Sequence, residues 1–84
     1  MITVLKFSAS WCGPCRQLTQ VLEPYTDLIT SVDVDEDTEL TDKYSIKSVP
    51  TLVFLKEDKE VDRVAGLITK EKFLHIYDTV KNSV

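Results

Sequence analysis

The 84-residue sequence contains no apolar segment that approaches the length of a membrane span, which takes about 20 residues in a helix. Its Met-Ile-Thr-Val start also lacks the basic region followed by a cleavable apolar region that is typical of a signal peptide. We therefore expect neither a membrane-spanning helix nor export. The expected location is the cytoplasm, without membrane contact.

Cysteine and histidine, the usual ligands of structural zinc, are scarce as well. Cys12 and Cys15 are the only cysteines, and His75 is the only histidine. A structural zinc site takes four ligands, so such a site would need a second chain here. We expect no metal, and no motif implies an organic cofactor. His75 lies between Glu71 and Asp78 on the polar side of a predicted helix, so we expect it at the surface.

Basic residues are fewer than acidic residues. Ten lysines and arginines stand against 14 acidic residues, a net charge of −4, and the acidic residues concentrate between Asp33 and Asp42. Nucleic-acid-binding surfaces are usually basic. The composition therefore argues against nucleic acid as a partner.

The spacing of apolar residues predicts strands and helices in the order βαβαββα, within one domain over residues 1–84. A domain this short buries about 60–65% of the surface of its unfolded chain, which leaves little margin of stability. A helix between the first two strands makes that pair parallel, and the last two strands form a hairpin. The strands are expected at 2–7, 29–34, 51–55 and 60–65, and the helices at 12–28, 39–44 and from 69 onward.

Three helix boundaries carry specific signals. The residues Asp35 to Asp37 resemble an N-cap cluster before the second helix, and Thr69 suits the N-cap of the last helix. Pro24 lies inside the first helical pattern, so we expect a kink or an early end near Glu23. Leu18, Leu22 and Leu28 otherwise continue the apolar face of that helix at helical spacing.

The sequence Trp11-Cys12-Gly13-Pro14-Cys15 follows the first predicted strand and opens the first helix. Two thiols three residues apart at a helix start indicate a redox pair. Residues at this spacing share a helix face, with Cβ atoms about 5–6 Å apart, and a small adjustment allows a disulfide. A disulfide across so short a loop would restrict the unfolded chain little, so a stabilising role is a poor explanation.

The two sulfurs are not expected to be equivalent. Cys12 lies at or just before the first helical residue, where free N–H groups and the helix dipole favour a thiolate. It should attack a substrate disulfide, and Cys15, one turn in and more shielded, should resolve the mixed disulfide. Pro14 suits the first helical turn. Gly13 keeps the approach open, and a semi-exposed Trp11 offers a flat apolar wall.

These residues resemble the active site of the thioredoxin family. Val49-Pro50-Thr51 is similar to that family's loop before a cis-proline, and Val64-Ala65-Gly66 to its glycine beside the substrate groove. The resemblance covers nearly the whole chain, without a counterpart of the family's first strand and helix. It implies an α/β thioredoxin-like fold with a four-stranded mixed sheet of order 2-1-3-4 and three helices on both faces.

The resemblance also implies an enzyme that reduces protein disulfides. Pro50 is expected to be cis and to expose the Val49 backbone, so that a substrate strand can pair with it beside Cys12. The implied partners are protein disulfides, with ribonucleotide reductase as one candidate, and a reductase that uses NADPH. The chain is expected to be a monomer.

Lys6 departs from the family. Thioredoxins usually carry a buried aspartate six residues before the first active-site cysteine, and its lysine partner aligns here approximately with Ser31. A cation at this place favours thiolates. One hypothesis is therefore that Lys6 lowers the thiol pKa values and makes the pair more oxidising. The alternative is that Lys6 reaches water or pairs with Asp33, with little effect on the sulfurs.

Two other functions stay open at this point. The length suits a glutaredoxin with glutathione as reductant, although glutaredoxins typically carry Pro-Tyr between the cysteines. The segment Leu67-Ile68-Thr69 also lacks the Gly-Asp type of glutathione contact. The second alternative function is that of a non-enzymatic binding subunit. Its complexes would survive loss of both cysteines.

Overall fold

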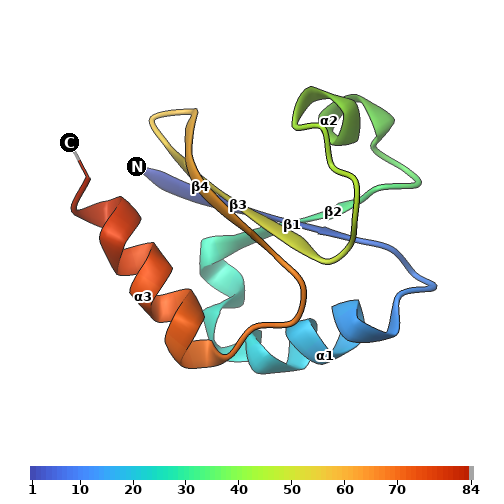
Figure 1. The fold of residues 1–84 in the computed structure, drawn as a ribbon, viewed down its shortest axis with the longest axis horizontal. Helices are drawn as coiled ribbons and strands as arrows, with labels where there is room; N and C mark the ends of the chain where they lie inside the picture. The colour runs from blue at the N-terminus through green and yellow to red at the C-terminus, as the bar shows by residue number, and fades with distance from the viewer. Residues whose placement is uncertain (84) are drawn as a thin grey trace.

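The computed structural model describes residues 1–83, which contain a four-stranded mixed sheet with helices on both faces (Figure 1). The strand order is β2-β1-β3-β4, as predicted, with β1 parallel to β2 and antiparallel to β3, and β3 antiparallel to β4. The elements are β1 (Ile2–Ser8), α1 (Gly13–Val21), the 3-10 helix η1 (Glu23–Leu28), β2 (Ile29–Asp33), α2 (Thr38–Lys43), β3 (Thr51–Lys56), β4 (Lys59–Ala65) and α3 (Lys70–Lys81).

The core forms two layers, one on each face of the sheet. Alternate residues of β1 point to opposite faces, so Val4 packs with Leu18 and Phe73, whereas Phe7 packs with Val53 and Tyr44. Figure 1 shows α1 and α3 on one face and α2 on the other. The central strand β3 is buried over residues 51–55 because both faces are covered.

The first helix ends early, as Pro24 predicted. α1 stops at Val21, and η1 follows with Pro24 in its first turn and a non-helical Tyr25. The expectation that Leu28 continues the apolar face is wrong, because this side chain is exposed. The tighter turn and the break at Tyr25 shift the 3.6-residue spacing that would have directed Leu28 inward.

Side-chain caps begin the other two helices where they were predicted. The Asp37 carboxylate accepts the Leu40 N–H at the start of α2, and the Thr69 hydroxyl accepts the Lys72 N–H at the start of α3. None of the helices within residues 1–83 is long and apolar enough to cross a membrane.

Candidate active site

The redox pair lies where β1 leads into α1. Cys12 is the N-cap of the helix and Cys15 lies in its first turn, with a Cα–Cα distance of 5.3 Å and a disulfide between the two side chains. The Cys12 sulfur accepts the backbone N–H of Cys15 at 3.2 Å. The cap position thus directs an N–H group and the positive end of the helix at Cys12 Sγ, which favours negative charge on that sulfur.

The two cysteines do not differ in burial as expected. Their exposed fractions are 4% for Cys12 and 3% for Cys15, so both lie below the surface. The expected greater shielding of Cys15 is therefore not visible in this oxidised form, because the S–S bond draws both sulfurs together. What separates them is the helix position, since only Cys12 receives the capping N–H.

The loop before β3 packs against the pair, and a second loop, at Gly66, bonds to that first loop. The Val49–Pro50 peptide bond is cis, and Val49 packs against a small apolar cluster of Ala9, Cys12 and Cys15. Gly66 has a φ of 91° and donates its N–H to the Pro50 carbonyl oxygen at 2.8 Å. Glycine suits this backbone conformation, which other residues rarely adopt. Val49 thus lies against the cysteines, and Gly66 is bonded to Pro50, the residue that follows Val49.

Trp11 is 67% exposed and is held by a residue that the sequence pattern did not single out. Its indole Nε1 donates to the Asp35 carboxylate at 3.0 Å. The signal was available in principle, because β1 and β2 are parallel and their carboxyl ends meet at one edge of the sheet. Trp11 follows the first of these strands and Asp35 follows the second.

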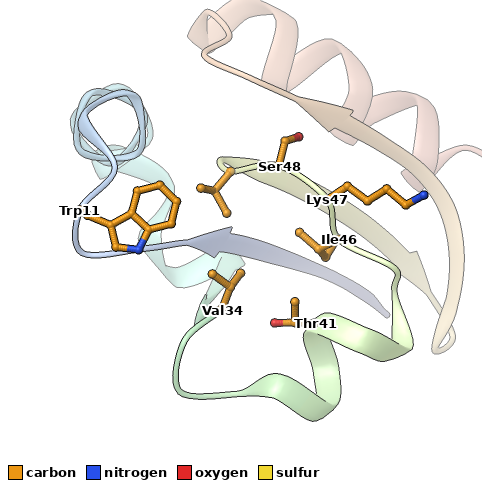
Figure 2. Close-up of a pocket in the computed structure, with 7 residues that line it drawn as sticks. Trp11, Val34, Thr41, Ile46, Lys47 and Ser48 are labelled. Atoms are coloured by element: carbon orange, nitrogen blue, oxygen red, sulfur yellow. The ribbon is translucent and has the colours of Figure 1, made fainter.

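A groove of about 240 Å³ opens between Trp11 and the segment before β3 (Figure 2). Its apolar side chains include Val34 and Val49, which also contact the cysteine cluster. Figure 2 shows the Lys47 side chain extending away from Trp11. The groove is smaller than the roughly 300–1,000 Å³ of typical small-molecule sites and has room for one large side chain. Its lining residues are Trp11, Val34, Thr41, Ile46, Lys47, Ser48 and Val49.

Gly13 and Pro14 form the exposed first turn of α1 between the two cysteines. A Cβ atom at Gly13 would meet no protein atom within 4 Å, so the fold itself does not require glycine there. The space over Gly13 is open to an approaching molecule. Pro14 occupies a first-turn position, where the missing N–H has no helical partner to lose.

Lys6 is buried on the face of the sheet that α1 covers, with 7% of its surface exposed. Its Nζ donates to the Thr19 hydroxyl at 2.7 Å, and that hydroxyl donates to the Cys15 carbonyl oxygen at 3.0 Å. Burial lowers the pKa of Lys6. Lys6 faces Ser31 across the parallel pair, as the alignment suggested, and no carboxylate in residues 1–83 pairs with it.

The expected alternative for Lys6, a pair with Asp33, is wrong. The Asp33 carboxylate instead accepts the N–H of Asp35 at 2.8 Å. Thr19 was not anticipated as a partner. Its position four residues after Cys15, on the same helix face and above β1, is the only signal that could have identified it.

His75 lies exposed on α3, as expected. Within residues 1–83 no three His, Cys, Asp or Glu side chains are grouped closely enough to hold a metal ion.

Comparison with known proteins decides the family. The family described as Thioredoxin matches residues 1–79. The chain belongs to the thioredoxin family. It is 39% identical over 80 residues to the thioredoxin of Chlamydia caviae, covering 89% of this chain and 78% of that relative. The thioredoxin of Chlamydia pneumoniae is 40% identical over 76 residues, covering 83% of this chain and 74% of that relative.

Solved thioredoxin structures show the same fold. A mutant thioredoxin from Halobacterium salinarum NRC-1 superposes with a TM-score of 0.89 at 30% identity, covering 99% of this chain and 77% of that one. Fasciola hepatica thioredoxin superposes with a TM-score of 0.85 at 36% identity, covering 93% of this chain and 79% of that one. With the Cys12–Cys15 pair in place, this member of the thioredoxin family is a thiol–disulfide oxidoreductase of the protein-disulfide reductase class. The thioredoxin interpretation is favoured over the glutaredoxin and binding-subunit alternatives.

Proposed function

We propose that Cys12 is the nucleophile and Cys15 the resolving thiol in the reduction of protein disulfides. The observation that carries this assignment is the N-cap position of Cys12, whose sulfur accepts the Cys15 N–H. A group at this position is stabilised as a thiolate by the helix start. Cys15 lies inside the turn and lacks that stabilisation.

The reaction transfers two electrons to the substrate. The Cys12 thiolate attacks one sulfur of the substrate disulfide, the substrate S–S bond breaks, and the leaving sulfur takes a proton. Cys15 then loses its proton and attacks Cys12 Sγ in the mixed disulfide. The second substrate sulfur leaves as a thiolate, and the Cys12–Cys15 disulfide remains.

Trp11, Val49, Pro50 and Gly66 form the proposed surface for the substrate segment. In residues 1–83 no hydrogen bond uses the N–H or carbonyl group of Val49, so both groups are available to pair with an extended chain. The adjacent groove is lined by apolar side chains together with Thr41, Lys47 and Ser48, and it has room for one substrate side chain. An open first turn at Gly13 and Pro14 leaves space above the sulfurs.

Lys6 is proposed to lower the thiol pKa values and to make the pair easier to reduce. Its ammonium lies within two hydrogen-bond lengths of the Cys15 carbonyl oxygen, through Thr19. A nearby positive charge favours a thiolate over a thiol. The proposal is supported by the partner of Lys6, which is Thr19 and not Asp33.

The proposed setting is a monomeric thioredoxin domain over residues 1–84 in the cytoplasm. Its oxidised form is recycled by a thioredoxin reductase that uses NADPH, and its substrates are protein disulfides, with ribonucleotide reductase as one candidate. Family membership supports this choice of reductant over glutathione.

The experiment compares two recycling systems at equal concentration of the oxidised protein. One contains NADPH with thioredoxin reductase, and the other contains glutathione with glutathione reductase. We expect the Cys12–Cys15 disulfide to be reduced at least tenfold faster by the first system. Faster reduction by glutathione would make the protein a glutaredoxin in function and overturn the assigned reductant.

A further inference from the structure

Lys6, Thr19 and Cys15 form a continuous chain of hydrogen bonds between the sheet and the active-site helix. Lys6 Nζ donates to Thr19 Oγ1, and Thr19 Oγ1 donates to the Cys15 carbonyl oxygen. We infer that Thr19 is a positioning residue for the redox pair, whose hydroxyl holds the Lys6 ammonium beneath the first turns of α1. This inference rests on the proposed roles of Lys6 and of the cysteine pair.

A threonine hydroxyl is suited to this task because it can accept from one group and donate to another at the same time. Thr19 accepts from the ammonium and donates to the helix backbone, so both ends of the link are defined. Lys6 itself is anchored in β1, with Ser31 opposite on one side and Leu52 on the other. Without the hydroxyl, the four-carbon stem of Lys6 could place its charge elsewhere.

The charged groups on the surrounding elements do not neutralise Lys6. On α1, Arg16 donates to the Ser10 carbonyl oxygen, and on β2 the Asp33 carboxylate accepts the Asp35 N–H. Lys56 lies at the far end of β3 and donates to the Lys81 carbonyl oxygen. Glu23, at the start of η1, is exposed. Within residues 1–83 the ammonium thus has no carboxylate within 4.0 Å to act as a close counter-charge.

The Lys6 ammonium interacts differently with the reduced and the oxidised forms of the cysteine pair. Reduction takes two electrons from an external dithiol and breaks the Cys12–Cys15 bond, after which one sulfur takes a proton and the other remains a thiolate. The disulfide carries no charge, whereas the thiolate is negative. A fixed ammonium therefore stabilises the reduced form selectively, and Thr19 acts by keeping it in range.

The test removes the hydroxyl while keeping the shape. Thr19→Val lacks the hydrogen-bonding atom, and Thr19→Ser keeps it as the matched control. The Cys12 thiol is titrated by the ultraviolet absorbance of its thiolate, and the equilibrium with glutathione is measured at pH 7. We expect Thr19→Val to raise the thiol pKa by roughly 0.5–1 unit. The reduced-to-oxidised ratio should fall by about threefold to tenfold, where tenfold corresponds to about 30 mV. Thr19→Ser should match the wild type.

Lys6→Met and the double variant show whether the effect passes through Lys6. The inference requires that Thr19→Val adds nothing further in the Lys6→Met background. A normal titration for Thr19→Val together with a shifted one for Lys6→Met overturns the role of Thr19 and leaves that of Lys6 intact. An equal Thr19→Val effect with and without Lys6 also overturns it, because the helix backbone would then carry the effect. The wild-type protein's reduction of a protein disulfide tests the proposed function separately.

Discussion

Cys12 and Cys15 are the same residue type, and the helix start gives them different surroundings. Cys12 Sγ occupies the cap and accepts the N–H of Cys15, whereas Cys15 has Thr19 bonded to its carbonyl oxygen one turn further on. Both side chains are equally buried in the disulfide form. The roles proposed for them therefore rest on position along the helix rather than on access to solvent.

Single substitutions at the pair should separate these roles. Cys15→Ser leaves the nucleophile and removes the resolving thiol, so it should accumulate mixed disulfides with substrate proteins. Cys12→Ser removes the thiolate stabilised by the cap and should reduce turnover by at least a thousandfold. Non-reducing electrophoresis and a disulfide-reduction assay measure the two effects. Equal trapping by both variants would contradict the assignment.

At the scale of elements, α3 is tied to the sheet at its carboxyl end. The Lys56 ammonium at the end of β3 donates to the carbonyl oxygens of Lys81 and Ser83. The last carbonyl groups of a helix lack partners within it, and a cation is favourable there. Since α3 supplies Phe73 to the core over β3, this link helps to hold a whole layer in place.

Lys56→Met should therefore weaken the docking of α3. It removes hydrogen bonds from a charged donor while keeping the apolar stem, and we expect a loss of about 1–2 kcal/mol in the free energy of unfolding. Urea denaturation measures it. Lys59→Met, at an exposed position across the same hairpin turn, is the matched control and should change stability by less than about 0.5 kcal/mol. An equal loss in both variants would show that the capping contacts add nothing.

At the scale of the whole molecule, the margin of stability is small because a chain of 84 residues covers a limited core. One charge buried without a carboxylate partner is then a noticeable opposing contribution. Burial lowers the pKa of Lys6 from its usual 10.5, so the folded state binds that proton less tightly than the unfolded chain. Holding this ammonium beneath α1 is therefore expected to lower folding stability.

Lys6→Met should for this reason be more stable than the wild type at pH 7. Below the folded-state pKa of Lys6 the burial penalty is fully present. As pH rises through that value toward 10.5, the folded protein releases the proton first and the penalty disappears. The difference between variant and wild type should accordingly shrink in this alkaline range. Denaturation of the disulfide form across pH measures it, with the exposed Lys47→Met as control. A difference that is constant with pH would contradict the prediction.

Much of the fold could be predicted because its signals are local. The apolar run of β1, the caps at Asp37 and Thr69, and the break at Pro24 each depend on neighbours within one turn or strand. Leu28 shows where this reasoning fails. Its apolar spacing is helical, but the 3-10 geometry of η1 turns it outward. The spacing of apolar residues cannot show how tightly a helix is wound.

The sequence by itself determined the chemistry, because two thiols at a helix start need no distant residue to form a disulfide or to differ in charge stabilisation. Tertiary structure alone decided what surrounds them. The sheet brings Asp35 to Trp11 and Gly66 to Pro50, and it places Lys6 under Thr19 rather than beside Asp33. These contacts join side chains and loops from different strands and helices. They depend on the pairing register of the strands and on the face of the sheet that each residue occupies. Both are fixed only when the strands and helices pack together.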